Sequence, residues 1–261
     1  MARIYPLFSS SKGNAVFIGT QAGGILIDAG VSARALTAAL SRSGLTLNAV
    51  RGIFITHSHS DHVRGLKMLS KKCGVPVFAQ PLTLRELIDG GMIAPESEAC
   101  ELDNAPLAFA DMQITPFATP HDTVQSCGFR IALSDGRCCA VCTDLGHAAK
   151  TVEDALTGCD LVLLEANYDE DMLRNGFYPP YVKARIASEN GHLSNTASGS
   201  LAKKLLTQGT TRLILGHLSE SNNTPEKAAA AVENALADAK RGRDYLLEVA
   251  KPETEGRMIA F

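Results

Sequence analysis

Three histidines and one aspartate lie within six positions of the stretch Thr56-His57-Ser58-His59-Ser60-Asp61-His62-Val63-Arg64-Gly65. The stretch directly follows the apolar run Gly52–Ile55, which is typical of a buried strand. Imidazole and carboxylate groups are unfavourable at the end of such a strand unless a cation binds them. Both are ligand types that divalent transition metals favour. The sequence therefore predicts a metal site here, and a catalytic one.

The spacing within this stretch indicates more than one metal ion. His57 and His59 are two positions apart, so in extended backbone they project to the same side and can bind one metal. Asp61 and His62 come after the chain turns, which directs them to a different point. Two neighbouring metal ions bind both the attacking and the leaving oxygen of a displacement reaction. A solvated histidine-rich loop is the alternative; it explains a lone histidine better than it explains this pattern.

The bulk properties are those of an ordinary globular protein. The chain has 261 residues, 45% of them hydrophobic and 20% charged, with a formal net charge of −3. That net charge does not indicate a nucleic-acid-binding protein. Bound divalent cations would, however, make the local potential in a cleft positive. The sequence contains no run of about 18 apolar residues, so we expect no membrane span. The seven cysteines do not have the spacing of a disulfide framework. We expect a reduced cytoplasmic protein, with buried free thiols at Cys138, Cys139 and Cys142 and no evident membrane or protein partner.

Strand-like and helix-like runs alternate along the chain. Neither a low-complexity linker nor a fixed-period repeat interrupts them, so we expect one domain over residues 1–261. Such a strand-rich chain with interspersed helices predicts two sheets flanked by helices. The main strands are expected at residues 16–19, 24–28, 52–56, 76–79, 112–117, 126–133, 138–143, 161–165 and 212–215, and the main helices at 32–43, 63–72, 82–88 and 228–240.

The motif His57-x-His59-x-Asp61-His62 resembles the hallmark of the metallo-β-lactamase-fold hydrolases. One residue before this motif, Asp28, and three after it, His121, Asp144 and His217, match the rest of that family's pattern in the expected order. The resemblance implies an α+β fold, a four-layer αβ/βα sandwich. It also implies that Asp28 orients the histidine loop without binding metal itself, which fixes the tautomer of a ligating imidazole.

The resemblance further implies a ligand set for two divalent metal ions. One ion is assigned to His57, His59, His121 and Asp144, and the other to Asp61, His62, Asp144 and His217, so that Asp144 bridges them. The cysteine ligand of some β-lactam-cleaving members is absent, a pattern closer to the phosphodiesterase and nuclease branches, although thioester hydrolases have similar sets. Nitrogen and oxygen ligands admit zinc, manganese or iron.

A second histidine lies in Asn190-Gly191-His192-Leu193-Ser194-Asn195, which is typical of a loop that opens a helix. A histidine here, with Ser194 and backbone amides at a helix N-terminus, suits a phosphate oxygen. In the resembling tRNase Z and RNase J groups, a histidine on a comparable loop contacts the scissile phosphate or protonates the leaving group. His192 is therefore the candidate general acid, and Glu165 a candidate to orient it. The alternative is a helix-cap loop with an incidental histidine.

Further stretches resemble the YycJ/WalJ-like subgroup of this fold, and that resemblance implies a DNA exonuclease. They are Ser9–Asn14, Leu164–Leu173, Gly176–Pro180 and Glu220–Asn223.

Several residues are candidates to contact a nucleic-acid substrate. Lys12 and Asn14 suit phosphate, or belong to a tight turn. Lys183 and Arg185 suit a nucleic-acid backbone, or a solvated helix face. Four aromatic residues suit base stacking, or loop packing: Tyr168, Phe177, Tyr178 and Tyr181.

Together these features predict a two-metal-dependent phosphodiesterase, specifically a DNA exonuclease that uses a metal-bridging hydroxide. Asp61 is expected to receive the nucleophile's proton while binding metal, and His192 to assist the leaving alkoxide. A small-molecule (cyclic) phosphodiesterase would use the same ligands. A glyoxalase-type thioester hydrolase shares the fold but leaves the His192 loop unexplained. The sequence leaves open DNA against RNA, the polarity of digestion and the oligomeric state.

Overall fold

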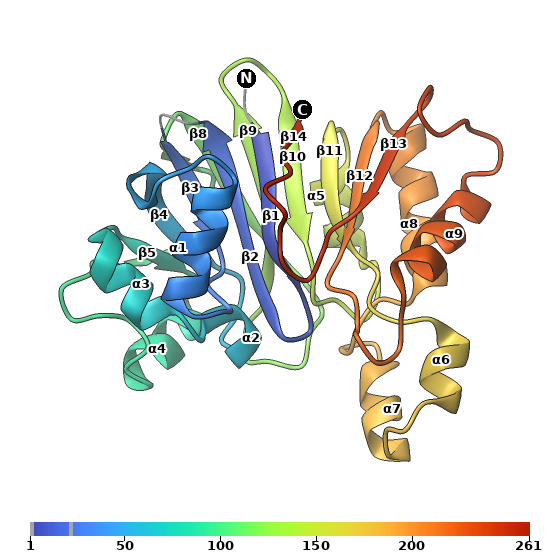
Figure 1. Cartoon of the computed structure of the whole chain (residues 1–261), viewed down its shortest axis with the longest axis horizontal. Coiled ribbons are helices and arrows are strands. Elements are labelled where there is room, and N and C mark those ends of the chain that lie inside the picture. The colour runs from blue at the N-terminus through green and yellow to red at the C-terminus, as the bar shows by residue number, and fades with distance from the viewer. Residues whose placement is uncertain (1–2, 21–22) are drawn as a thin grey trace. The chain divides into compact units, whose positions relative to one another are not determined.

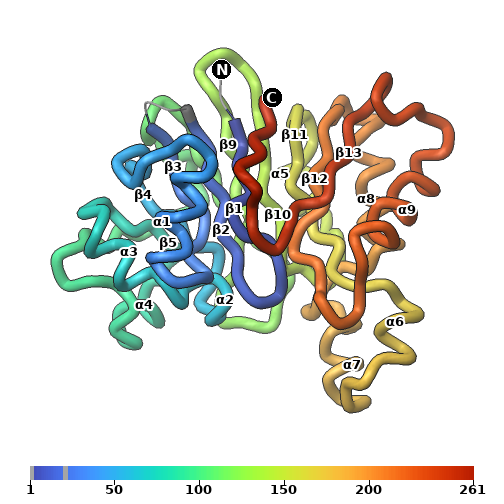
Figure 2. The backbone as a smooth tube through the Cα atoms, in the orientation of Figure 1, coloured from blue at the N-terminus to red at the C-terminus, as the bar shows by residue number. Residues whose placement is uncertain are grey.

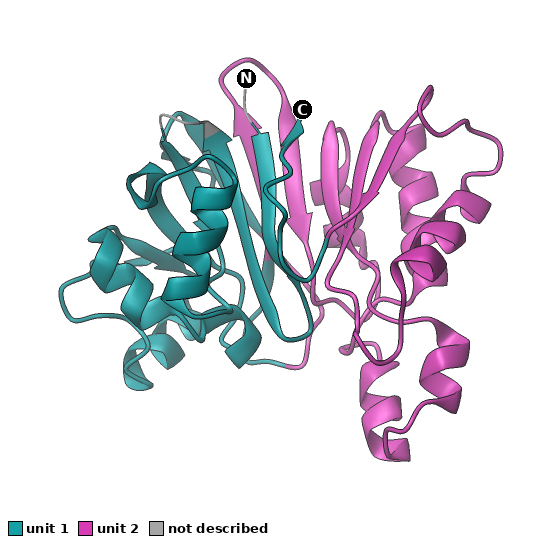
Figure 3. Cartoon of the chain, in the orientation of Figure 1, with its two compact units in different colours: residues 1–116, 123–127, 251–261 teal, residues 117–122, 128–250 magenta. Residues whose placement is uncertain are grey.

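The computed structural model describes residues 3–20 and 23–261. By their contacts these residues divide into two compact units, coloured separately in Figure 3. Unit 1 comprises residues 1–116, 123–127 and 251–261, and unit 2 comprises residues 117–122 and 128–250. The end of the chain thus returns to the unit in which it began, as the tube in Figure 2 traces. The expectation of a single domain over the whole chain stays a prediction.

Unit 1 is built on a seven-stranded mixed sheet with the strand order β14-β1-β2-β3-β4-β5-β6 (Figure 1). The first three strands in sequence pair antiparallel, whereas β3 to β6 pair parallel. Because parallel strands end at the same edge, the residues that follow β3 and β4 lie side by side. The strands are β1 (Arg3–Ser10), β2 (Gly13–Thr20), β3 (Gly23–Ile27), β4 (Val50–Ile55), β5 (Val77–Ala79), β6 (Ala99–Glu101) and β14 (Ile259–Ala260).

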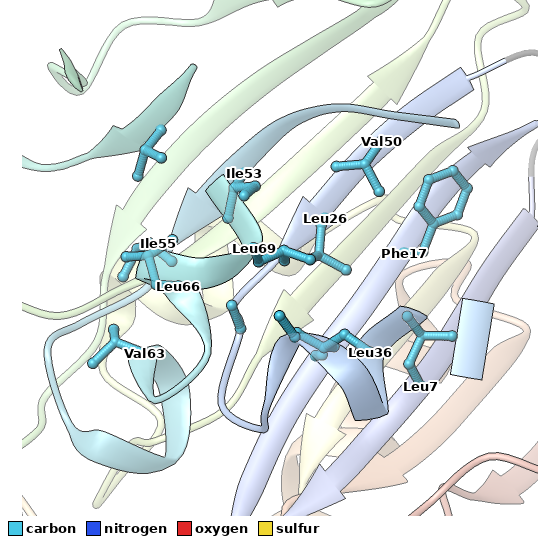
Figure 4. Close-up of a cluster of buried hydrophobic side chains, with 14 of the residues drawn as sticks. Leu7, Phe17, Leu26, Leu36, Val50, Ile53, Ile55, Val63, Leu66 and Leu69 are labelled. Atoms are coloured by element: carbon cyan, nitrogen blue, oxygen red, sulfur yellow. The ribbon is translucent and has the colours of Figure 1, made fainter. Parts of the chain in front are cut away.

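Helices cover one face of this sheet and bury a common core (Figure 4). In α1 (Ala33–Arg42), the Ser32 hydroxyl caps the first turn by accepting from Ala35 N at 3.2 Å, and Leu36 is fully buried. A fully buried leucine contributes about 1.5–3 kcal/mol to folding. The other elements of unit 1 are η1 (Leu47–Ala49), α2 (Ser60–Val63), α3 (Leu66–Cys73), α4 (Pro81–Asp89), β7 (Leu107–Phe109) and β8 (Met112–Ala118), which continues into unit 2.

The strands of unit 2 lie in the order β13-β12-β11-β10-β9. The four strands β10 to β13 pair parallel, and β9 pairs antiparallel with β10. Every residue of β10 and β11 is buried, which explains why both read as continuous apolar runs. Cys138, Cys139 and Cys142 are buried free thiols, as predicted. The strands are β9 (Cys127–Leu133), β10 (Cys138–Cys142), β11 (Leu161–Glu165), β12 (Arg212–Gly216) and β13 (Leu246–Val249).

Five helices complete unit 2 within the described residues. Its core includes Val152, Leu201, Leu205 and Val232, so three of these helices pack on the sheet or on each other. Among the helices of residues 3–20 and 23–261, none combines the length and the apolar character that a membrane crossing requires. The helices are α5 (Lys150–Leu156), α6 (Glu170–Asn175), α7 (Pro180–Ile186), α8 (Asn195–Thr207) and α9 (Pro225–Ala235).

Two predicted helices differ from the structure for identifiable reasons. The helix expected at 63–72 is divided into α2 and α3 around Gly65. A Cβ atom at Gly65 would lie 1.9 Å from Val31 O, so the backbones pack closely there. The helix expected at 228–240 ends at Ala235, because the chain then turns towards β13 through a bond from Ala239 N to Leu236 O.

Candidate active site

The histidine loop, residues 56–62, follows the carboxyl end of β4 in unit 1. The ring centroid of His57 lies 4.6 Å from that of His59 and 4.1 Å from that of His62. The Oδ2 atom of Asp61 lies 3.3 Å from His62 Nε2. His57 and His62 are buried, whereas His59 and Asp61 are partly exposed. Unit 1 thus brings together the four loop residues that the sequence predicts as ligands.

Asp28 holds this loop through its carboxylate. Asp28 Oδ1 accepts from Thr56 N at 2.9 Å, and Oδ2 lies 2.8 Å from His62 Nδ1. These contacts arise because β3 and β4 are parallel neighbours, so Asp28 and Thr56 leave the sheet at the same edge. Burial raises the pKa of Asp28, and the contacts with His62 and Thr56 oppose that rise. The structure therefore places Asp28 where it can orient His62, as the resemblance implied.

Thr56 is a contributor that the sequence reasoning missed. Its hydroxyl lies 2.9 Å from Asp28 Oδ2, to which it donates, and 3.0 Å from His57 Nδ1, from which it accepts. One side chain thereby joins the orienting carboxylate to a second histidine. The only signal in the sequence is a hydroxyl residue between an apolar strand and the first histidine.

Asn14 lies beside the histidine loop and is buried. Its amide Nδ2 donates to Ser10 O at 3.0 Å and to Asp61 Oδ2 at 3.3 Å, and it lies 3.1 Å from His62 Nε2. Lys12, two residues earlier, is exposed in the turn between β1 and β2. The two residues predicted to bind phosphate therefore have different surroundings, and Asn14 contacts predicted metal ligands.

In unit 2, the predicted ligands lie at the carboxyl edge of the sheet. Strands β10, β11 and β12 are parallel neighbours, and Asp144, Glu165 and His217 stand at or just after their carboxyl ends. Ligand-type atoms of these three residues and of His192 all lie within 4.8 Å of one another. His121, in the loop after β8, places Nε2 3.7 Å from Asp144 Oδ1. We call these five residues the carboxyl-edge group.

Glu165 is the centre of the carboxyl-edge group. Its fully buried carboxylate places Oε1 2.7 Å from His192 Nδ1 and 2.8 Å from His217 Nδ1. Oε2 accepts from Leu145 N at 3.0 Å and from Leu193 N at 3.1 Å. Burial alone would raise the pKa of Glu165, but His192 and His217 outweigh it and lower the pKa. An ionised carboxylate with four donors fixes both imidazoles and both loops. The sequence reasoning linked Glu165 to His192 alone.

His192 has a partly exposed side chain, with 20% of its surface accessible. Its backbone N donates to Ile186 O at 2.9 Å, at the end of α7. Burial lowers the pKa of His192, but the Glu165 carboxylate outweighs it and raises the pKa above the ordinary value. The contact with Glu165 therefore orients the imidazole through Nδ1 and leaves Nε2 as its other nitrogen.

The histidines fit a metal site through the nitrogen that each leaves available. Metal-ligating histidines usually donate their other ring N–H to a protein acceptor. Four of the five predicted ligand histidines have Nδ1 beside such an acceptor, which would leave Nε2 to hold a metal ion. The pairs are His57 with Thr56 Oγ1, His62 with Asp28, His121 with Gly191 O at 3.1 Å, and His217 with Glu165.

Three residues of these loops have left-handed backbone conformations. The φ angles are 61° at Asp28, 60° at Asp144 and 54° at His217. Such a conformation costs roughly 1–3 kcal/mol in a residue other than glycine and persists only where the surroundings impose it. Each of the three follows a buried strand. The strained conformation therefore occurs where a carboxylate or imidazole must turn out of the strand direction into the predicted site.

The remaining predicted substrate contacts also lie in unit 2. Ser194 caps α8, with its hydroxyl accepting from Ala197 N at 3.2 Å. Arg185 Nε forms an ion pair with Asp122, next to His121. Lys183 Nζ donates to Arg174 O at 2.8 Å. Their roles in substrate binding stay predictions.

The fold and these ligand groups are those of a known superfamily. A family model described as "Beta-lactamase superfamily domain" matches residues 24–218. The structure is similar to that of the metallo-β-lactamase fold protein YhfI from Bacillus subtilis, with a TM-score of 0.76 at 15% identity, over 97% of this chain and 98% of that one. The predicted α+β metallo-β-lactamase fold is thereby confirmed. The chain belongs to the β-lactamase superfamily, in its metallo-β-lactamase-fold branch.

Two curated relatives narrow the family further. The chain is 32% identical to the exodeoxyribonuclease YycJ of Bacillus anthracis over 93% of this chain and 92% of that protein. It is 31% identical to the exodeoxyribonuclease WalJ of Streptococcus pneumoniae over 95% of this chain and 94% of that protein. The predicted membership in the YycJ/WalJ group is confirmed. The family and its histidine and aspartate groups make this chain a metal-dependent hydrolase.

Proposed function

We propose that the protein is a two-metal-dependent phosphodiesterase, and specifically a DNA exonuclease. The observation that carries this proposal is the pairing of His192 with Glu165, because it places a proton donor within the carboxyl-edge group. Thioester hydrolysis gives no role to such a donor beside the metal ligands. The names of the two curated relatives support the choice of DNA.

The proposed ligands are those that the sequence pattern selects. His57, His59, His121 and Asp144 are assigned to one ion, and Asp61, His62, Asp144 and His217 to the other. All donors are nitrogen or oxygen, which suits zinc or manganese, and also iron. Divalent ions in such a site supply an activated water near neutral pH and neutralise charge on the phosphate.

The residues of the chain have separate roles in this proposal. Asp61 accepts the proton of the attacking water while it also binds metal. His192 donates a proton from Nε2 to the departing oxygen, and Glu165 accepts from Nδ1–H and stabilises the protonated imidazole before that transfer. Asp28 and Thr56 keep His62 and His57 in the tautomer that leaves Nε2 for metal.

The experiment that tests this proposal is digestion of DNA labelled at either the 5′ or the 3′ end, with manganese or zinc added to metal-stripped protein. We expect mononucleotides to be released progressively from one end. The protein should also hydrolyse bis-p-nitrophenyl phosphate, which has no base, and should leave S-lactoylglutathione intact. Cleavage of cyclic nucleotides without cleavage of DNA would overturn the proposal in favour of a small-molecule phosphodiesterase.

His192→Ala separates the proposed acid from the metal ligands. Loss of a general acid typically costs 10²–10⁴-fold in rate, so we expect kcat on DNA to fall by about 10²-fold or more. The metal content measured by mass spectrometry should stay within about 20% of the wild-type value, because only non-ligand chemistry is removed. His59→Ala is the matched comparison, and it should lose metal and activity together.

A further inference from the structure

Exposed aromatic side chains occur at one place in the described residues. Phe177 is fully exposed, Tyr181 is 75% exposed and Tyr178 is 37% exposed. The other phenylalanines and tyrosines of the described chain are buried or half-buried. All three exposed rings lie within five positions, between α6 and the first turn of α7. We call residues 174–186 the aromatic segment.

Internal packing does not account for these rings. Helix α7 has no buried residue, so none of its side chains anchors a core. Pro179 and Pro180 fix the backbone at the start of α7. Aromatic rings that gather at one exposed place are typical of a binding surface. In Figure 1, α6 and α7 extend from unit 2 beyond the carboxyl end of β11.

One cation of this region suits a phosphate group. Residues 172–188 contain Arg174, Lys183 and Arg185 and lie between the acidic residues Asp171 and Glu189. Arg174 pairs with Asp171 and Arg185 with Asp122, so Lys183 is the cation on which the argument rests. The Lys183 ammonium contacts a backbone carbonyl, Arg174 O, so this contact leaves its charge in place. Aromatic rings interleaved with cations are the combination with which proteins bind single-stranded nucleic acid: bases stack on the rings, and cations follow the phosphates.

The aromatic segment is continuous with the carboxyl-edge group. At the end of α7, Ile186 O accepts from His192 N at 2.9 Å, and Arg185 pairs with Asp122, the neighbour of His121. The connecting loop is tightly packed: a Cβ atom at Gly191 would lie 2.2 Å from Ile186 O. The end of α7 is therefore held next to the loop of the candidate general acid.

We propose that the aromatic segment is a docking surface for the unpaired bases of a single DNA strand. Phe177 and Tyr181 stack on bases, and Lys183 contacts the phosphate backbone. The proposal deepens the exonuclease function and rests on it. It gives the enzyme a preference for a single-stranded substrate over a blunt duplex, whose bases are stacked on each other and unavailable to the rings.

The test compares a DNA substrate with a small phosphodiester, using the full-length, metal-loaded protein. Base stacking on an aromatic ring contributes about 1–3 kcal/mol, so removing two rings in F177A/Y181A should raise KM for a single-stranded oligodeoxynucleotide about tenfold or more. Hydrolysis of bis-p-nitrophenyl phosphate should change by less than about twofold, because that substrate has no base to stack. Phe177→Trp should keep the wild-type KM for DNA, while Phe177→Leu should not. Ile88→Ala, which truncates an exposed apolar residue on α4, is the matched control and should change neither assay.

Each outcome decides the proposal. An unchanged KM for DNA in F177A/Y181A overturns it, and so does an equal loss in both assays, which indicates a structural role. Loss of a dimer in light scattering, together with loss of activity, identifies a second copy as the occupant and also overturns it. If the wild-type protein hydrolyses bis-p-nitrophenyl phosphate but no DNA, the exonuclease function fails; the docking surface is then judged by fluorescence anisotropy of the labelled single strand.

Discussion

The histidine loop of unit 1 and the carboxyl-edge group of unit 2 both place histidines around a buried carboxylate, but their residues are distributed differently along the chain. In unit 1, the four predicted ligands lie within six positions, and one segment after β4 supplies them all. In unit 2, the carboxyl-edge group is collected from four separate loops and the last residue of β11, between His121 and His217. Both groups nevertheless place one buried carboxylate beside the Nδ1 atoms of histidines, Asp28 in unit 1 and Glu165 in unit 2.

The difference between the two carboxylates is the number of groups that each one holds. Asp28 contacts one histidine and both the hydroxyl and the backbone amide of Thr56, whereas Glu165 contacts two histidines and two backbone amides. The direction of the pKa shift follows from this difference, since burial raises the pKa of Asp28 while two imidazoles lower that of Glu165. Glu165 thus holds two histidines in unit 2, whereas Asp28 holds one in unit 1. This conclusion can be tested by substitution.

Glu165→Gln should have the largest effect. The glutamine amide has about the volume of the carboxyl group but carries no charge to stabilise a protonated His192. Its NH₂ group would also face one of the N–H groups that donate to the Glu165 carboxylate. We expect a fall in kcat/KM of about 10³-fold on DNA, combining loss of the acid with misorientation of a metal ligand. The measurement is kcat/KM with metal content determined in parallel. A loss no greater than that of His192→Ala would contradict the role of Glu165 at His217.

Asp28→Asn should have a smaller effect confined to one histidine. Outer-sphere partners of metal ligands typically contribute 10–100-fold to metal affinity or activity, so we expect metal affinity to fall by about 30-fold, as measured by competition with a chromophoric chelator. Excess metal should restore most of the activity, because His192 and Glu165 are unaltered. Failure of excess metal to restore activity would show that Asp28 does more than orient His62.

Much of this organisation was predictable, and the part that was not has a physical reason. The histidine loop could be predicted as a metal site from the sequence alone, because several metal-ligand residues at such short spacing have no other common explanation. The fold class and Asp28 followed from the resemblance. Glu165 at the end of a fully apolar strand carries the same local signal as Asp28, but its two histidines are 27 and 52 positions away. Only the parallel order of β10, β11 and β12 shows that these residues meet.

The role of Asn14 could not be read from the sequence for a related reason. Ser9–Asn14 has the composition of a turn, and a turn asparagine usually faces solvent or its own backbone. In the structure, Asn14 is buried and contacts Asp61, 47 positions later. This contact depends on where β1 and β2 place their turn relative to the histidine loop, which no local pattern encodes.

Asn14→Ala should have the smallest effect of the series, and it distinguishes a positioning role from phosphate binding. Loss of a buried donor to Ser10 O and Asp61 typically costs about 1–2 kcal/mol, so urea denaturation should show a lower free energy of unfolding by that amount. A metal held by His62 Nε2 would replace the neighbouring contact with Asn14, and the contacts of Asn14 with Ser10 and Asp61 would remain. We therefore expect a decrease in metal affinity of about fivefold with KM for DNA unchanged at saturating metal. Lys12→Ala, two residues away in the exposed turn, is the matched control and should leave unfolding within about 0.5 kcal/mol. A higher KM for DNA in both variants would instead assign this turn to phosphate binding. Unit 1 would then contribute a substrate contact as well as metal ligands.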